Sequence, residues 1–296
     1  MQETMLVFGS KGYFGSKIVD HFTHQGWQVE KSTTDIRNYQ EVIGEIERIR
    51  PGVVINAAGK TGTPNVDWCE THRAETMSTN VAGAVNVASA CDLHGVYMVH
   101  LGSGCIYEGD NGGIGFRETD EPNFYGSFYS RTKLHSEKLL ADLNVLQLRI
   151  RIPIEGRSNA KNVIDKLLKY EKIISVPNSF TVVEDFLPAV EQLVTRRERG
   201  IFNMTNVGSM DHEFLMNRYS QIVDPSKKFT VMTVDEMYAK YASTKRSNCI
   251  LNTEKREAIG IHMPPIRERI VSILEAYKRN PLEQQNHGKD DPASVG

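Results

Sequence analysis

The strongest structural signal in the sequence is the stretch Met5-Leu-Val-Phe-Gly-Ser-Lys-Gly-Tyr-Phe-Gly15. A short apolar run, typical of a buried strand, leads into three glycines, and apolar side chains at helical spacing follow over residues 13–25. Glycines between a strand and a helix allow a tight turn, and the free N–H groups at the start of the helix attract a pyrophosphate. The stretch therefore predicts a dinucleotide-binding loop.

Strands and helices then alternate as far as residue 152. Apolar runs predict further strands at 27–31, 53–57, 96–101 and 145–150, and helical periodicity predicts helices at 38–50, 82–94 and 129–143. Such alternation implies right-handed crossovers and a parallel sheet covered by helices on both faces. We therefore predict an α/β, doubly wound, Rossmann-like domain over residues 1–152.

The remainder of the chain is less regular. Helical stretches at 162–170, 185–196, 212–222 and 266–279 alternate with short apolar runs at 173–176 and 201–205. We interpret residues 153–280 mainly as a smaller α/β lobe that binds the substrate. Residues 281–296 are polar, with almost no apolar side chain, which predicts a disordered tail.

Composition argues against several functional classes. The 296 residues are 40% hydrophobic with a formal net charge of −2, so no basic field exists to drive nucleic-acid binding. The apolar runs are only strand-length, which predicts no membrane span. Cys69, Cys91, Cys105 and Cys249 form no C-x-x-C pair, so we expect neither a metal site nor a disulfide framework. We expect a soluble, cytoplasmic protein.

Two interpretations of the cofactor remain open at the end of the predicted second strand. Glu30 lies about 20 residues past the glycine loop, where an acid binds the ribose 2′-hydroxyl of NAD. Lys31 and Ser32 follow at once, and either would suit the 2′-phosphate of NADP. We favour NADPH, with NADH as the alternative.

The stretch Tyr129-Ser-Arg-Thr-Lys133 places a tyrosine and a lysine on one face at the start of a predicted helix. A ketone that accepts a hydride becomes an oxyanion and needs a proton, which a tyrosine can supply. A nearby ammonium group favours the phenolate and so lowers the tyrosine pKa from its reference value of about 10. Ser103, at the end of a predicted strand, is positioned to hydrogen-bond the same carbonyl oxygen.

Together with the glycine loop and Asn56-Ala-Ala-Gly59, these residues resemble, in order and spacing, the extended short-chain dehydrogenase/reductases. Stretches at 60–70, 113–116, 122–129 and 177–181 are similar to the bifunctional UDP-4-keto-6-deoxyglucose 3,5-epimerase/4-reductases that form UDP-rhamnose in plants. The stretch 101–107 resembles GDP-fucose synthase, and a more distant similarity links the chain to dTDP-4-dehydrorhamnose reductase.

The resemblance implies a role for each matching residue. Tyr129 would donate the proton, Lys133 would assist it and bind a cofactor ribose, and Ser103 would orient the carbonyl. Asn80 would support the helix that carries Tyr129. The expected cofactor-binding residues, from the loop and from the resemblance, are Gly9, Lys11, Gly12, Tyr13, Phe14, Gly15, Lys31, Asp35, Ile36, Asn56, Ala57, Ala58, Gly59, Asn80 and Lys133.

Epimerisation needs an acid and a base beside the acidified C3 and C5 positions of a 4-keto sugar. Cys105 lies two residues beyond Ser103, so both side chains leave the same face of an extended strand. In the resembling enzymes the cysteine at this position is one acid/base group, and a lysine matching Lys166 is the other. Asn162 stands where GDP-fucose synthase has a histidine. The alternatives are a small buried hydrophobe at Cys105 and a solvated surface lysine at Lys166.

Substrate contacts are expected after the third predicted strand, at the edge where ligands bind such sheets. Asn65, Asp67 and Glu70 offer polar groups there for sugar hydroxyls. Asn162 and Arg151 complete the expected substrate-binding set, because a guanidinium group suits the paired oxygens of a diphosphate.

We therefore predict an NDP-4-keto-6-deoxyhexose 3,5-epimerase/4-reductase that produces an NDP-rhamnose, with UDP favoured as the nucleotide. A separate upstream 4,6-dehydratase would supply the substrate, and the family resemblance implies a homodimer. Two alternatives remain open: a 4-ketoreductase without epimerase activity, in which Cys105 and Lys166 are structural, and a non-catalytic NADP-binding regulatory subunit. The complete set of Ser103, Tyr129 and Lys133 argues against the second alternative.

Overall fold

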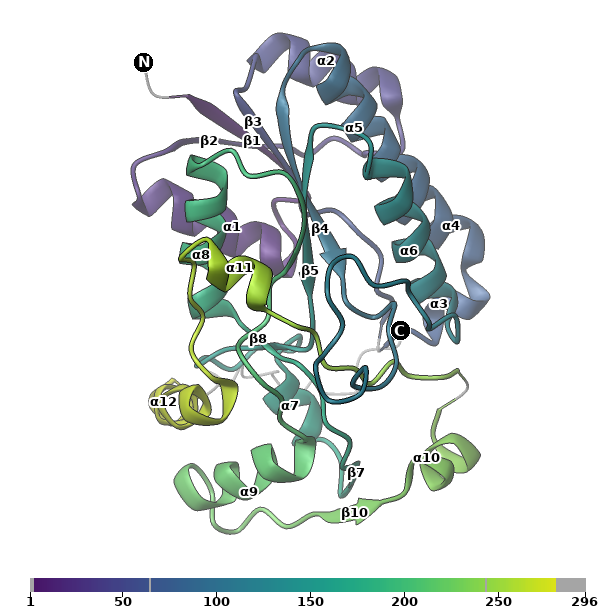
Figure 1. The fold of residues 1–296 in the computed structure, drawn as a ribbon, viewed down its shortest axis with the longest axis vertical. Coiled ribbons are helices and arrows are strands. Elements are labelled where there is room, and N and C mark those ends of the chain that lie inside the picture. The colour runs from purple at the N-terminus through teal and green to yellow at the C-terminus, as the bar shows by residue number, and fades with distance from the viewer. Residues whose placement is uncertain (1–2, 64, 243, 281–296) are drawn as a thin grey trace, which may run out of the picture.

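A parallel sheet of six strands forms the centre of the computed structural model, which describes residues 3–63, 65–242 and 244–280 (Figure 1). The strand order is β2-β1-β3-β4-β5-β9, which confirms the predicted doubly wound α/β fold. The order reverses at β1, so the carboxyl ends of β1 and β3 flank the crevice where such sheets bind ligands. The bounds are Thr4–Phe8 for β1, Gln28–Lys31 for β2, Val53–Asn56 for β3, Tyr97–Ser103 for β4, Val145–Ile150 for β5 and Gly200–Asn203 for β9.

Helices cover both faces of this sheet. Met5 and Val7 of β1 belong to one apolar core, whereas Leu6 and Phe8 of the same strand belong to another. Burial on both faces explains why β1 is a continuous apolar run. Figure 1 shows the two groups of helices on opposite sides of the strands. The first face carries α1 (Tyr13–His24) and α8 (Val183–Thr195), and the second carries α2 (Tyr39–Ile49), α5 (Ala84–Leu93) and α6 (Phe128–Leu140).

The segment from 183 to 203 differs from its predicted place in the substrate lobe. Strand β9 pairs with β5 from Leu146↔Gly200 to Arg149↔Asn203 and so completes the sheet. Phe186 of α8 lies in the same apolar core as Met5 and Val7. The chain thus leaves the sheet after β5 and returns to it with α8 and β9, which corrects the predicted single boundary at residue 152.

The remaining segments form a smaller lobe beyond the carboxyl ends of the strands, in the lower part of Figure 1. This lobe has its own apolar core, to which Phe180, Met216 and Ile270 belong. Within the described residues, no helix is long and apolar enough to cross a membrane. The predicted tail at 281–296 lies outside the described residues. The lobe contains β6 (Pro153–Ile154), α7 (Val163–Leu167), β7 (Lys172–Ile174), β8 (Thr181–Val182), α9 (His212–Ile222), β10 (Thr230–Met232), α10 (Val234–Lys240) and α12 (Ile266–Arg279). Helix α11 (Glu254–Ala258) contacts β9 of the central sheet instead.

A buried ion pair fixes α6 to the sheet. Nε and Nη2 of Arg149 on β5 each donate to a carboxylate oxygen of Glu137 on α6 at 2.8 Å. The two side chains are only 2% and 7% exposed. Because the bidentate geometry satisfies both buried charges, the pair sets the position of the helix that carries Tyr129.

The substitution Glu137→Gln should destabilise the protein by about 3 kcal/mol or more, because it leaves the Arg149 guanidinium buried without a compensating charge. Urea unfolding followed by circular dichroism measures this change. Glu254→Gln is the matched control, since its ion pair with Arg117 is exposed to solvent, with side chains 70% and 52% accessible. A loss in Glu137→Gln no larger than in the control would contradict the structural role of the buried pair.

Candidate active site

The glycine loop between β1 and α1 leaves no room for side chains. Gly9 has a φ of +71°, and a Cβ there would lie 2.5 Å from the backbone nitrogen of Ala58. A Cβ on Gly15 would collide with the carbonyl oxygen of Gly9. Gly12 precedes α1 without a side-chain cap, so the first N–H groups of this 12-residue helix have no side-chain acceptor at that position. Such a cradle fits a pyrophosphate.

The side chains around this loop are of two kinds: exposed lysines, and residues that hold the loop and α1 in place. Lys11 in the loop and Lys31 at the end of β2 are both exposed. Ser10 Oγ donates to the carbonyl oxygen of Ser32 at 2.9 Å, which ties the loop to the end of β2. Phe14 packs edge-on against Phe186 of α8 at 5.2 Å and so anchors α1. Phe14 is therefore placed as a packing residue, whereas the lysines remain accessible to a ligand.

Tyr13 was expected to bind the cofactor through its position in the loop. Its ring packs edge-on against Phe14 at 5.1 Å, and its buried hydroxyl has no hydrogen-bond partner within the described residues. Burial, followed by the nearby Glu155 carboxylate, raises the pKa of Tyr13. The hydroxyl is thus kept protonated beside the Glu155 carboxylate.

Asp35 and Ile36, both expected to bind the cofactor, lie in two different environments. Asp35 is about half exposed and accepts from Nε of Arg37 at 2.9 Å, and these hydrogen bonds lower the pKa of Asp35. Ile36 is only 2% exposed and belongs to the core beneath α2 and α5. A Cβ on Gly83 would lie 2.7 Å from Ile36 Cδ1, so the isoleucine fills the space beside that glycine. The Ile36 side chain is thus a packing residue, and a contact of this residue with the cofactor stays a prediction.

Asn80 joins the loop after β3 to α6. It lies in a π-helical segment, Ser78–Gly83, which directly precedes α5. Its Oδ1 accepts from the backbone nitrogen of Lys60 at 2.7 Å, and its Nδ2 donates to Lys60 O at 3.0 Å and to Thr132 Oγ1 at 3.2 Å. Asn56, fully buried at the end of β3, accepts from the backbone nitrogen of Ala58 at 3.1 Å. Both asparagines therefore shape the loop that contains Ala57 and Gly59.

The expected reducing residues lie together at the end of β4 and the start of α6. Helix α6 begins after Ser127, whose side chain accepts from the backbone nitrogen of Ser130 at 3.1 Å. Ser103 ends β4 and is 4% exposed. Lys133 Nζ donates to the carbonyl oxygen of Leu101 on β4 at 2.7 Å. The lysine is thus held beneath the site, one helical turn from Tyr129.

Electrostatics in this cluster keep Tyr129 protonated. Burial is the largest effect and raises the pKa of Tyr129, the neighbouring Cys105 acts in the same direction, and a hydrogen bond with Ser103 opposes them. Burial also lowers the pKa of Lys133 to about 8, against the opposing charges of Glu137 and Cys105. Burial therefore outweighs the effects that lower the pKa of Tyr129, and the lowering expected from the Lys133 ammonium group stays a prediction. A protonated phenol is the form that a proton donor requires.

Cys105 lies beside these residues and contacts a buried arginine. Arg151, which directly follows β5 and is 3% exposed, donates from Nη1 to Cys105 Sγ at 2.9 Å. Its Nη2 donates to Ser247 O at 3.0 Å and to Asn178 Oδ1. We expected Arg151 to bind a diphosphate, but it is buried and its guanidinium group is engaged by the protein. The structure therefore places it under Cys105.

Asn162 and Lys166 differ in accessibility. Asn162 is fully buried, and its Nδ2 donates to Glu155 O at 2.8 Å and to Arg157 O at 2.9 Å. Its Oδ1 accepts from Ile164 N at 3.2 Å and caps α7. The cap explains why Asn162 is not available to a sugar, contrary to expectation. Lys166 is exposed on α7, yet partial desolvation of its ammonium group, followed by nearby lysine charges, lowers its pKa.

The three polar residues expected to bind the sugar brace loops in the structure. Asn65 Oδ1 accepts from the backbone nitrogen of Asp67 at 2.8 Å. Asp67 accepts from both terminal nitrogens of Arg246, at 2.8 and 2.7 Å. Glu70 accepts from the backbone nitrogen of Phe128 at 2.5 Å, at the start of α6. Glu70 therefore helps to position the helix that carries Tyr129.

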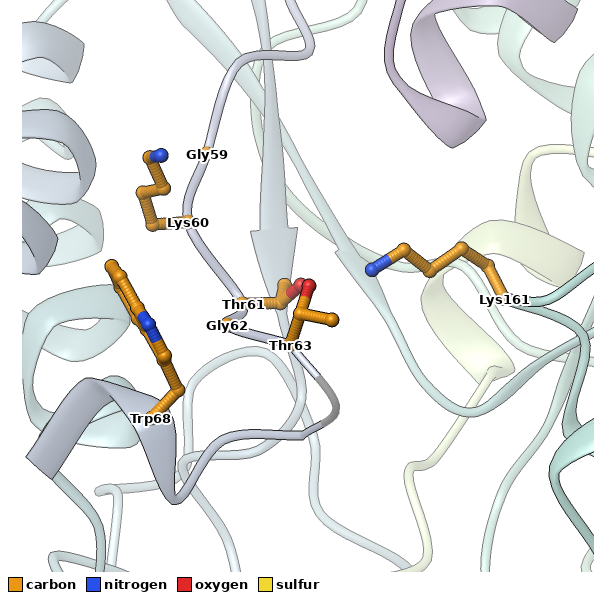
Figure 2. Close-up of a pocket in the computed structure, with 7 residues that line it drawn as sticks. All are labelled: Gly59, Lys60, Thr61, Gly62, Thr63, Trp68 and Lys161. Carbon is orange, nitrogen blue, oxygen red and sulfur yellow. The ribbon is translucent and has the colours of Figure 1, made fainter. Parts of the chain in front are cut away.

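A cavity of about 300 Å³ lies next to this loop, a volume suited to a small ligand. In Figure 2, Trp68 and Lys60 line one side, and Lys161 reaches from the lobe toward Thr61 and Thr63 on the other. The threonines follow the carboxyl end of β3, a position that could have marked them as ligand contacts. No pattern in the sequence marked Lys161, because its approach depends on how the lobe meets the sheet. Among the described residues, no cluster of His, Cys, Asp or Glu could hold a metal ion.

Comparisons with known proteins agree with this site. The chain matches the RmlD substrate binding domain family over residues 3–279. It is 37% identical over 286 residues to a bifunctional dTDP-4-dehydrorhamnose 3,5-epimerase/dTDP-4-dehydrorhamnose reductase of Arabidopsis thaliana, with 94% of this chain and 95% of the relative covered. It is also 37% identical to a trifunctional UDP-glucose 4,6-dehydratase/UDP-4-keto-6-deoxy-D-glucose 3,5-epimerase/UDP-4-keto-L-rhamnose-reductase of that plant, with 93% of this chain and 42% of the relative covered.

A solved structure extends the similarity to the whole fold. The L780 UDP-rhamnose synthase of Acanthamoeba polyphaga mimivirus superposes with a TM-score of 0.89 at 31% identity, covering 93% of this chain and 100% of that one. The resemblance inferred from the sequence, to extended reductases of nucleotide-linked keto sugars, is confirmed. The chain belongs to the RmlD substrate-binding family.

Proposed function

We propose that the protein is a 3,5-epimerase/4-reductase that converts an NDP-4-keto-6-deoxyhexose into an NDP-rhamnose. The observation that carries the proposal is the position of Cys105 beside Tyr129 at the carboxyl end of β4, where Ser103 and Lys133 also lie. A reductase needs only Tyr129, Ser103 and Lys133, whereas a cysteine at this place adds a group able to exchange carbon-bound protons. The bifunctional Arabidopsis thaliana relative, of which 95% is covered, carries both activities in its name.

A nicotinamide dinucleotide fits the cradle formed by Gly9, Gly12 and Gly15, where side chains are excluded. When bound, its reduced nicotinamide would supply the hydride for the 4-keto carbon. The exposed Lys11 and Lys31 would pair with a 2′-phosphate, which favours NADPH over NADH. Ala57 and Gly59 would line the same cofactor, next to the loop that Asn80 holds.

In the reduction, Tyr129 donates its phenolic proton to the oxygen of the 4-keto group as that oxygen gains negative charge. Ser103 orients the carbonyl oxygen from the end of β4. Lys133, held on the Leu101 carbonyl, provides a cation below the phenol and a ligand for the cofactor ribose. Because burial keeps Tyr129 protonated, the donor is ready at neutral pH.

In the epimerisation, the 4-keto group acidifies the protons at C3 and C5. Cys105 and Lys166 are the proposed acid/base pair: one removes the proton, and the other returns a proton to the opposite face of the carbon. The lowered pKa of Lys166 brings an amine closer to the range needed for exchange. Lys161 and Thr63, which line the cavity, are proposed to contact the nucleotide sugar, for which we favour UDP.

The substitution Tyr129→Phe should lower the rate of ketone reduction by about 10²- to 10⁴-fold, because the oxyanion loses its proton donor. Deuterium incorporation at C3 and C5 from deuterated water should continue. NADPH oxidation and product mass, followed together, separate the two steps. Tyr125→Phe is the control, since that side chain is 52% exposed and its hydroxyl donates to Pro122 O. Full reduction by Tyr129→Phe would exclude Tyr129 as the donor.

The substitutions Cys105→Ala and Lys166→Met should each abolish deuterium incorporation at C3, C5 or both, while reduction of an already epimerised 4-ketone continues. A separate 3,5-epimerase can supply that ketone for the assay. Lys169→Met is the control for Lys166, because Lys169 is another exposed lysine close by on the same segment. Wild-type exchange in both variants, with reduction intact, would leave a 4-ketoreductase without epimerase activity.

The substitution Lys31→Glu should raise the KM for NADPH at least about tenfold, because it replaces a cation near the 2′-phosphate with an anion. The KM for NADH should stay the same or fall, and kcat should change little with either cofactor. Lys240→Glu at the end of α10 is the control for charge reversal. An equal change in the two KM values would argue against Lys31 as the phosphate ligand.

A further inference from the structure

Two buried arginines near the end of β5 differ in whether a carboxylate neutralises their charge. Arg149 forms a bidentate ion pair with Glu137. Arg151 is equally buried at 3% exposure, yet among the described residues no carboxylate lies within ion-pair distance of its guanidinium group. Buried charges in proteins are normally paired, so the charge of Arg151 calls for an explanation.

The guanidinium group of Arg151 is directed at a sulfur atom. Its Nη1 donates to Cys105 Sγ at 2.9 Å and to Ser247 Oγ at 3.2 Å. Its Nη2 donates to Ser247 O at 3.0 Å and to Asn178 Oδ1, so the plane of the group is fixed from two sides. Cys105 itself is half-buried. The contact therefore joins a fixed cation to a side chain that opens on the proposed site.

The backbone next to Cys105 leaves space for the side chain of Arg151. A Cβ on Gly104 would lie 2.8 Å from Cδ and Cγ of Arg151, so the glycine leaves the space through which the arginine stem reaches Cys105. The main chain of Arg151 is held by Thr181, whose Oγ1 accepts from Arg151 N at 3.0 Å and whose backbone nitrogen donates to Arg151 O at 2.8 Å. Stem and main chain are thus both constrained.

We propose that Arg151 is a positioning residue for epimerisation: it holds Cys105 Sγ in place and supplies the positive charge that faces the sulfur when Cys105 transfers its proton. This inference rests on the proposed function. It explains why a buried guanidinium group lacks a carboxylate partner, because the matching negative charge arises only during the reaction.

In one direction, Cys105 acts as a thiol and gives its proton to a carbon of the sugar. The S–H bond of Cys105 breaks as a C–H bond forms at C3 or C5, and the negative charge of the enolate moves to sulfur. In the reverse direction, the thiolate takes the proton from carbon and the charge returns to the enolate. In both directions one state has an anionic sulfur 2.9 Å from Arg151.

Other ionisable groups also face Cys105, and a test must distinguish their effects from the effect of Arg151. Tyr129 and Lys133 of α6 interact with Cys105, and so does Cys249 from the segment that follows Ser247. Lys133 is the other cation in this group, but its Nζ is directed at the carbonyl oxygen of Leu101. Arg151 is the cation that contacts the sulfur directly.

Arg151→Met and Arg151→Lys test the inference. Deuterium incorporation at C3 and C5 is measured with the 4-keto-6-deoxy substrate in deuterated water without reduced cofactor, and reduction is measured separately with the epimerised ketone. Arg151→Met should lose about ten- to a hundredfold in exchange, the effect of losing a charge-assisted hydrogen bond, and keep its reduction rate within about threefold. Arg151→Lys should recover part of the exchange, because it restores a cation without the second donor group.

Arg218→Met is the control for loss of an exposed arginine, and its exchange should equal that of the wild type. If Arg151→Met does not fold, Arg151→Lys is the deciding variant, because it retains the charge. A loss of exchange with unchanged reduction in Arg151→Lys would support the inference, and exchange at the wild-type rate would overturn it. Equal losses of exchange and reduction in a folded variant would also overturn it, because they indicate a general structural role. Absence of exchange in the wild type would instead overturn the proposed epimerase function.

Discussion

The ion pair between Arg149 and Glu137 is the interaction on which the rest of the site depends. It crosses from β5 to α6 in the interior, where two unpaired charges would be strongly destabilising. Because Glu137 is one helical turn from Lys133, the pair fixes both the position of the lysine and part of its electrostatic environment. The other end of α6 is held by Glu70, which accepts from the Phe128 backbone nitrogen. The helix is thus fixed at both ends, with Tyr129 between them.

The positions of the polar loop residues follow from the same requirement. A loop after a parallel strand has backbone groups that no neighbouring strand can satisfy, so side chains must satisfy them. Asn80 does so for Lys60, whereas Asp67 holds the side chain of Arg246. Asp67 and Glu70, which the sequence suggested as sugar ligands, therefore brace the protein, and other residues line the cavity. The surface left for a ligand includes Thr61, Thr63 and Lys161.

The sequence predicts features that depend on local chemistry and misses those that depend on distant contacts. The strand, glycine loop and α1 are predicted almost to the residue, because backbone geometry restricts each position. The return of β9 to β5 is missed, since a four-residue strand has no local mark of its partner. Asn162 was expected to bind the sugar, but its side chain is buried and caps α7. The Ile36 side chain is buried beside Gly83, a residue distant in the sequence, so its burial has no local mark.

The distribution of charge separates structure from chemistry. Arg149 is neutralised by a carboxylate and serves the fold. Within the described residues, Arg151 and Lys133 instead donate hydrogen bonds to neutral acceptors, namely Cys105, Ser247, Asn178 and the Leu101 carbonyl. Oriented positive charge without a resident anion costs stability, but it stabilises negative charge that appears on sulfur or oxygen during a reaction. An enolate and a reduced carbonyl both present such charge. These two cations, next to Cys105 and at the end of β4, therefore mark the place where the chemistry is expected to occur.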